Sequence, residues 1–185
     1  MARLLYVANT SVDGYVEDEQ GGIDWAAPND EVFAFLTDLV RPVGTHLCGR
    51  RMYEAMAVWE TDPGMAEQSA LMADFARLWQ ELDKVVYSTT LDAVPTARTR
   101  IERRFDPDAV RATKAAAAAN LLVGGADLAG QALAAGVVDE VHLVVRPIAI
   151  GGGTPALPLG IRLDLDLLRA TEVADGVVHL RYGVR

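Results

Sequence analysis

The sequence has only one cysteine and three histidines among its 185 residues. Cys48 alone cannot form an internal disulfide, and it leaves too few thiols for a zinc ribbon or for a zinc-dependent deaminase site. No two of the histidines have the sequence spacing of paired metal ligands. We therefore expect neither a disulfide framework nor a bound metal ion.

Basic residues and long apolar runs are scarce as well. The chain has 17 lysines and arginines against 26 acidic residues, a formal net charge of −9, and this charge repels nucleic acids and anionic membrane surfaces. No apolar run approaches the length of a membrane span, and no N-terminal segment resembles a signal peptide. These features predict a cytoplasmic protein that binds small molecules, not nucleic acids or membranes.

What the sequence does contain is an alternation of strand-like and helix-like segments. Apolar runs predict strands at residues 3–9, 45–49, 84–88, 99–105, 120–125 and 138–150. Amphipathic patterns and capping residues predict helices at residues 29–40, 65–82, 106–119 and 126–135. The tail predicts a hairpin that turns at Asp175-Gly176. We therefore predict an α/β fold with a mostly parallel central sheet, helices on its faces and a C-terminal antiparallel hairpin, in one domain of residues 1–185.

The stretch "LLVGGADLAG" combines a buried strand, two glycines and a helix start. Backbone N–H groups at such a start favour an anion such as a pyrophosphate, and glycine lets a ligand approach closely. The stretch does not match the GxGxxG motif, because Ala126 replaces the second glycine, nor the P-loop, because Gln131 replaces its lysine. A phosphotransferase is thus disfavoured. A tight turn without a ligand explains Gly124 and Gly125 equally well.

Two further strand ends carry groups that bind phosphate. In "LCGRRMYE", Gly49 is followed by Arg50 and Arg51, whose forked guanidinium groups suit a phosphate, although a solvated basic surface has the same composition. In "YSTT", three hydroxyl residues end the next strand, where sheet ligands tend to bind, although such residues are also common in turns.

The segment "WAAPND" places an acid beside an indole at the start of an apolar helix. Asp30, near Trp25, could act as a proton donor if its surroundings raise its pKa. Acids at this position are more often helix caps, and on the residues alone we favour a cap for Asp30, although Asn29 is equally placed to cap the helix.

Taken in order, these segments resemble the dihydrofolate reductase superfamily, and more closely its branch that includes the reductase domain of bacterial riboflavin biosynthesis. The likeness is carried by "SVDGYV", "LCGRRMYEAM", "VVYSTTL", "LLVGGADLAGQAL", "VDEVHLVVRPIAIGGGTPALP" and the closing hairpin, which span nearly the whole chain. The resemblance implies a three-layer dihydrofolate reductase-like fold. It also implies NADPH as the hydride donor and reduction of a C=N or C=O bond in a pterin-like or pyrimidine-like substrate.

The resemblance also implies a set of site residues. Those that would bind the cofactor are Gly49, Arg50, Arg51, Ser88, Thr89, Thr90, Gly124, Gly125, Ala126, Asp127 and Leu128. Asp30 would supply or relay a proton, and Asp13, Trp25 and Tyr53 would form the substrate site. In "SVDGYV", the loop that closes over the nicotinamide, Asp13 would shape the loop and Gly14 would allow its turn.

The sequence departs from the family pattern in two places. A long segment with its own helix lies between Tyr53 and Lys84, where folate reductases place an arginine for the glutamate tail. The motifs H-x-E and P-C-x-x-C of the accompanying deaminase are absent, so we expect a stand-alone reductase. An alternative is a paralogue that binds a nucleotide or acts as a scaffold without catalysis. The apolar run "VHLVVRPIAI" suggests a homodimer paired through this strand.

Overall fold

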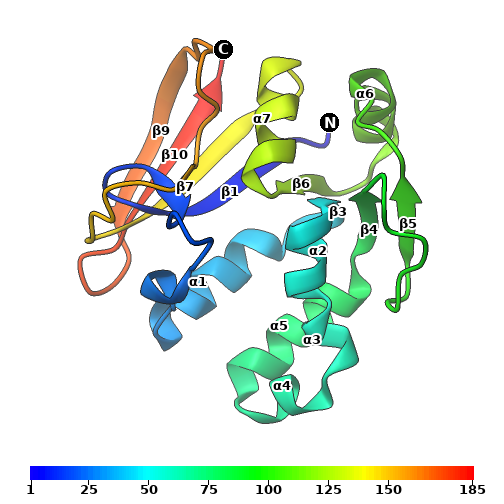
Figure 1. The fold of residues 1–185 in the computed structure, drawn as a ribbon, viewed down its shortest axis with the longest axis horizontal. Coiled ribbons are helices and arrows are strands. Elements are labelled where there is room, and N and C mark those ends of the chain that lie inside the picture. The colour runs from blue at the N-terminus through cyan, green and yellow to red at the C-terminus, as the bar shows by residue number, and fades with distance from the viewer.

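An eight-stranded sheet forms the centre of the computed structural model, which describes all 185 residues (Figure 1). Its strand order is β5-β4-β3-β6-β1-β7-β10-β9. The bounds are β1 Leu4–Ser11, β3 Val43–Gly49, β4 Asp83–Tyr87, β5 Thr99–Glu102, β6 Asn120–Gly124, β7 Glu140–Arg146, β9 Leu165–Glu172 and β10 Val178–Val184. All neighbours from β5 to β7 are parallel, and β10 and β9 continue the sheet antiparallel. The predicted fold class is confirmed.

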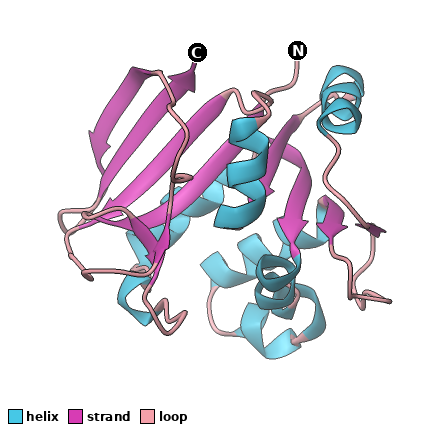
Figure 2. Cartoon of the chain, turned by 45° about the horizontal axis from the view of Figure 1, so that its top comes forward, coloured by secondary structure: helices cyan, strands magenta, loops and turns pink.

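Helices cover both faces of this sheet and complete the three layers (Figure 2). The helices are α1 Asp30–Val40, α2 Arg50–Met56, α3 Val58–Thr61, α4 Pro63–Glu67, α5 Ala70–Glu81, α6 Pro107–Ala116 and α7 Ala126–Ala134, with a short 3-10 helix, η1, at Asp24–Ala26. Alternate residues of a strand face opposite layers. Thus Leu121 and Val123 pack with α7, whereas Leu122 packs with Trp79 of α5.

The predicted elements are largely present, and their ends follow from local chemistry. Asp106 caps α6 by accepting hydrogen bonds from two backbone N–H groups, as its sequence predicts. The closing hairpin turns at Asp175 and Gly176, which have φ angles of 51° and 73°, as a type I′ turn requires.

Three predictions about the elements were wrong. The helix expected at residues 65–82 is two helices, because Ser69 adopts an extended conformation and caps α5. Of the two residues predicted as possible caps of α1, Asn29 is the cap, since its side chain accepts a hydrogen bond from Val32 N, whereas the cap favoured for Asp30 is not formed. The strand expected at 138–150 ends at Arg146, because Pro147 lacks the N–H that would continue the ladder.

The position of β7 also changes the expected homodimer contact. β7 pairs with β1 on one side and with β10 on the other, so both of its edges are occupied. The strands with a free edge are β5 and β9. β7 therefore offers no free edge to the β-strand of a second copy, and the homodimer stays a prediction.

A separate two-stranded sheet of β2 (Tyr15–Glu17) and β8 (Thr154–Pro155) joins the loop after β1 to the loop after β7. None of the helices combines the length and the hydropathy that a membrane-spanning segment needs.

Candidate functional site

The ends of three parallel strands lie in one row at the carboxyl edge of the sheet. Gly124 at the end of β6 is in register with Cys48 of β3, and Gly49 is in register with Tyr87 at the end of β4. The next residue after β6, Gly125, has a φ of +91°, and a Cβ built on it would lie 3.9 Å from Gly49 N. The structure thus brings together the three strand ends that the sequence predicts to bind a cofactor.

Two helices begin at this row, and neither has a side-chain cap. Gly49 precedes α2 and Gly125 precedes α7, and no side chain bonds the first N–H groups of either helix. The first turn of α7 contains Ala126, Asp127 and Leu128, whose N–H groups have no carbonyl partner within the helix. Such groups bind anions well, and the missing Cβ atoms leave room for one.

Gly124 was predicted to be glycine so that a ligand can approach the backbone closely, but the structure shows another reason. A Cβ on this residue would lie 2.5 Å from Nε2 of His46, which is buried beneath it. Both ring nitrogens of His46 lack hydrogen-bond partners, and burial, followed by the charge of Lys84, lowers the pKa of the imidazole to about 4. The ring is therefore neutral at pH 7. Core packing, and not the approach of a ligand, explains this glycine.

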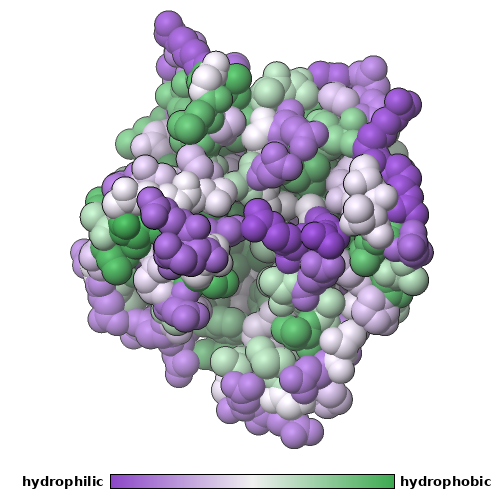
Figure 3. Space-filling model, viewed as in Figure 1, coloured by the Kyte–Doolittle hydropathy of each residue, from purple (hydrophilic) through white to green (hydrophobic).

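The two arginines after Gly49 are held only loosely. Arg50 is half exposed, with its Nη1 3.9 Å from Glu54 Oε1, and Nη1 of Arg51 lies 3.6 Å from Glu17 Oε2. These exposed pairs contribute little energy, so an incoming phosphate can replace them. Figure 3 shows hydrophilic side chains across the middle of the face on which α2 and α7 begin.

The hydroxyl residues after β4 divide into two kinds. Ser88 is buried, and its Oγ accepts hydrogen bonds from Thr90 N and Leu91 N, so it shapes the turn. Arg103 holds the same turn by donating to the carbonyl oxygens of Ser88 and Leu91. Thr89 and Thr90 are exposed. Of the three predicted cofactor residues, only these two present free hydroxyl groups to solvent.

A cavity of about 240 Å³ adjoins this row of strand ends. A second cavity, of about 280 Å³, lies at the opposite edge of the sheet and is described below. The smaller cavity lies between α6 and the strands β4 and β5, and its lining includes Tyr87, Arg100 and Arg104. Arg104 is exposed and forms no ion pair or side-chain hydrogen bond within 4 Å. Sequence reasoning missed Arg104, because the strand predicted at residues 99–105 includes it, whereas β5 ends at Glu102.

Asp13 holds two loops together. Its carboxylate accepts hydrogen bonds from Gly151 N at 2.8 Å and Ile150 N at 3.2 Å. The hydrogen bond with Ser11, followed by the one with Gly151, lowers the pKa of this carboxyl. Gly14, with a φ of +92°, makes the turn. Asp13 therefore shapes the loop as predicted, and its oxygens are already used within the chain.

The remaining predicted residues occupy different environments. Trp25 is half-buried in η1 and donates a hydrogen bond to Gly22 O, while Asp30 is exposed at the start of α1. Tyr53 is 1% exposed within the core, and its hydroxyl shares a 2.7 Å hydrogen bond with Thr96 Oγ1. The prediction that Tyr53 contacts the substrate was wrong, because both its ring and its hydroxyl are enclosed by the protein.

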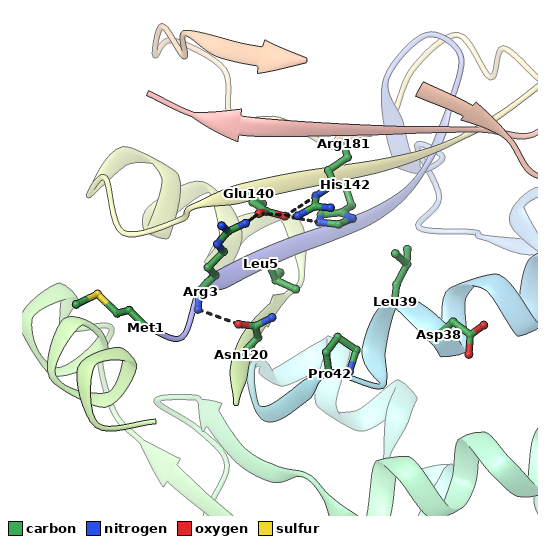
Figure 4. A pocket seen from close by; sticks show the side chains of 10 residues that line it. All are labelled: Met1, Arg3, Leu5, Asp38, Leu39, Pro42, Asn120, Glu140, His142 and Arg181. Carbon is green, nitrogen blue, oxygen red and sulfur yellow. Dashed lines mark hydrogen bonds and ion pairs between the residues drawn. The ribbon is translucent and has the colours of Figure 1, made fainter. Parts of the chain in front are cut away.

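The cavity of about 280 Å³ lies at the opposite, amino edge of the sheet (Figure 4). Figure 4 shows three side chains converging on Glu140: Arg3, just before β1, Arg181 of β10 and His142 of β7. Burial raises the pKa of the Glu140 carboxyl, but the hydrogen bonds and charges of Arg181, with the bonds of Arg3 and His142, outweigh it and hold the pKa at about 2. Because these groups satisfy one another, we do not place the functional site here.

The histidines of this cluster form a pair that the sequence did not reveal. His142 Nδ1 and His179 Nε2 are 3.1 Å apart, and both rings are buried. Burial lowers the pKa of both imidazoles, that of His179 to about 4.

The sequence is similar to known proteins over nearly its whole length. The profile of the family described as "RibD C-terminal domain" matches residues 3–179. The chain is 23% identical over 181 residues to the "Uncharacterized protein YyaP" of Bacillus subtilis (strain 168), a match that covers 97% of this chain and 94% of that protein.

Three solved structures have a similar fold. A putative riboflavin biosynthesis protein from Shewanella sp. PV-4 has a TM-score of 0.76 and 22% identity, with 100% of this chain and 99% of that chain covered. The deaminase/5-amino-6-(5-phosphoribosylamino)uracil reductase of Thermotoga maritima has a TM-score of 0.67 and 11% identity, with 100% and 57% covered. Dihydrofolate reductase of Enterococcus faecalis, solved with NADP(H), has a TM-score of 0.61 and 11% identity, with 99% and 96% covered.

The contact between Gly124 and His46 gives a first prediction. Gly124→Ala would place a methyl group 2.5 Å from Nε2 of His46, and we expect the free energy of unfolding to fall by about 1–3 kcal/mol. In a His46→Ala background only Cγ of the flexible Met52 side chain, at 3.2 Å, remains close to the methyl group, so the same substitution should cost much less. Urea denaturation of the four chains measures this coupling. An equal cost in both backgrounds would show that His46 does not dictate the glycine.

The three buried histidines give a second prediction. Each has a folded pKa below its ordinary value of 6.5, so the unfolded chain binds protons that the folded chain does not. The free energy of unfolding should therefore be constant above pH 6.5 and fall as the pH is lowered towards 4. His179→Gln should reduce the slope by about one proton. Urea titrations at several pH values measure this dependence of the free energy of unfolding on pH. A flat profile between pH 7.5 and 4.5 would contradict the lowered pKa values of the three histidines.

Proposed function

Because the chain belongs to the RibD C-terminal domain family, we propose that it is an NADPH-dependent reductase of a C=N or C=O bond in a pyrimidine-like or pterin-like small molecule. The observation that carries the proposal is the register that brings Gly49, Gly125 and the turn after Tyr87 to one edge of the sheet. Family membership supports a reductase, and this edge supports the choice of a dinucleotide as its cofactor.

The donors at this edge fit the phosphates of a dinucleotide. The N–H groups of Ala126, Asp127 and Leu128 would hold the pyrophosphate, because no side chain caps them. The cavity beside Tyr87 would take the adenosine end. Glu102 and Asp106 also line this cavity, but Arg104 has no carboxylate oxygen within 4.0 Å. Arg50 and Arg51 would provide further charge. When bound, NADPH supplies a hydride.

The proton that accompanies a hydride needs a donor on the substrate side. Helix α1 runs back from the carboxyl edge, since it connects the segment after β1 to the start of β3. Its first residue, Asp30, therefore lies at the edge where the parallel strands end. It is exposed and has no ion pair, so a substrate can reach its carboxyl group. We assign Asp30 the role of supplying or relaying this proton.

A second candidate is a nucleotide-binding protein without catalysis. Two of the predicted substrate-site residues, Tyr53 and Asp13, are engaged within the chain. This observation leaves Asp30 and Trp25 as the predicted residues that could act on a substrate. The second candidate predicts that NADPH binds and is never oxidised.

Cofactor binding gives a third prediction. NADPH added to the purified chain should show saturable binding, followed by its fluorescence. Arg104→Met and Arg50→Ala should each weaken NADPH about tenfold more than NADH, because NADH lacks the additional phosphate. The exposed Arg162, which is paired with Asp164, provides the control Arg162→Met. Absence of binding up to about 1 mM NADPH, which would leave a binding free energy weaker than about −4 kcal/mol, would remove the proposal.

The role of Asp30 gives a fourth prediction. Asp30→Asn should lower the rate of NADPH oxidation about 10²-fold, the usual contribution of a positioned acid, and leave the Kd for NADPH unchanged. The assay uses 5-amino-6-(5-phosphoribosylamino)uracil, the compound in the name of the Thermotoga maritima relative. A variant as fast as the unmodified chain would show that the proton comes from elsewhere. Binding of NADPH without oxidation by the unmodified chain would favour the second candidate.

A further inference from the structure

Arg146 is a buried cation at the carboxyl edge of the sheet. It is the last residue of β7, in register with Ser11 at the end of β1, and it is 7% exposed. Its Nε donates to Asn9 Oδ1 at 3.1 Å, and its Nη2 donates to Ala26 O at 2.6 Å. These two bonds fix the plane of the guanidinium group.

No carboxylate neutralises this charge. Arg146 has no Asp or Glu oxygen within 4.0 Å, whereas the other deeply buried cation, Lys84, lies 3.3 Å from Glu60 Oε2 and also donates to two carbonyl oxygens. The half-buried Lys114 likewise pairs with Asp139 at 2.8 Å. Burying an unpaired charge is costly, and the chain has acids in excess. Burial lowers the pKa of Arg146, but an arginine stays charged at pH 7.

One nitrogen of the group is left for a ligand. Nη1 has no hydrogen-bond partner in the chain, and it is not among the four side-chain atoms that are fully buried without a partner. Nη1 is therefore not fully enclosed by the chain, and it has two unused donors. An arginine held in this way is oriented before a ligand arrives, so little conformational entropy is lost on binding.

The neighbours of Arg146 belong to the predicted substrate side. Ala26 is the last residue of η1 and follows Trp25 directly, and α1 with Asp30 begins four residues later. Asn9 bonds the same carbonyl oxygen through its Nδ2. Figure 1 shows β1 and β7 side by side, with the chain after β1 leading to α1. The unpaired guanidinium group of Arg146 thus contacts the segment that leads to the proposed proton donor.

We propose that Arg146 determines specificity by binding an anionic oxygen, a carboxylate or a phosphate, on the substrate. The inference rests on the proposed reductase function and adds the charge of the group that the substrate must carry. Its alternative is a structural role, in which Arg146 only supports the Ala26 carbonyl.

Two pairs of small molecules test whether Arg146 binds an anionic oxygen, and each is titrated into the full chain saturated with NADPH. Orotate is compared with uracil, which lacks the carboxylate, and ribose 5-phosphate is compared with ribose, which lacks the phosphate. Isothermal titration should show that at least one anionic probe binds about tenfold or more tightly than its neutral partner, as a charge-assisted hydrogen bond provides. The pair that shows the preference identifies the anion.

Three variants separate recognition from structural support. Arg146→Met should abolish the preference without lowering the Tm, because an apolar side chain replaces an unpaired buried charge. Asn9→Asp places a carboxylate beside Nε and should also remove most of the preference. The control Arg162→Met should retain it.

The outcomes are distinct from those of the cofactor test. Equal binding within both pairs, including no binding by any of the four probes, overturns the inference, as does a preference that survives Arg146→Met. A lower Tm of Arg146→Met with no preference in the unmodified chain supports the structural alternative. NADPH binding is measured separately by fluorescence. If NADPH does not bind, that result counts against the reductase proposal, and the four probes are titrated into the chain without NADPH with the same outcomes.

Discussion

The pairing of β3 with β4 on one side and with β6 on the other is the constraint from which the candidate site follows. It places Gly124 beside Cys48, and Gly49 beside Tyr87, at one edge of the sheet. Buried apolar residues on both faces fix this register, because a shift of one residue would turn every apolar side chain to the wrong layer. The core therefore determines where the helix starts and polar groups of the site converge.

The same packing lets His46 influence the shape of the site, although its side chain would not touch a ligand. The ring occupies the space over Gly124, so this residue must be glycine, and Gly125 after it can adopt the positive φ that begins α7. A buried, neutral imidazole thus supports the turn whose free N–H groups would hold a phosphate. Local positive groups at this edge, Arg50, Arg51 and Arg104, stand out in a chain of net charge −9, because specific binding depends on nearby donors more than on the overall charge.

The sequence was sufficient for the strands and for their order of alternation with helices, since continuous apolar runs and capping residues are local signals. The sequence was less informative about residues whose environment depends on contacts with distant parts of the chain. Tyr53 looks like a pocket residue in sequence, yet its hydroxyl is satisfied by Thr96, 43 positions away. Arg146 looked like part of a continuous apolar strand, and only the folded chain shows that no acid accompanies it. The break at Ser69 was a local signal that the apolar periodicity of residues 65–82 obscured.

A crystal structure of the chain crystallised with NADPH would test the central claim most directly. The account predicts the pyrophosphate at the N–H groups of Ala126, Asp127 and Leu128, with the adenosine end beside Tyr87 and Arg104. A dinucleotide bound at the amino edge of the sheet, near Glu140 and Arg181, or nowhere near Gly125, would contradict it.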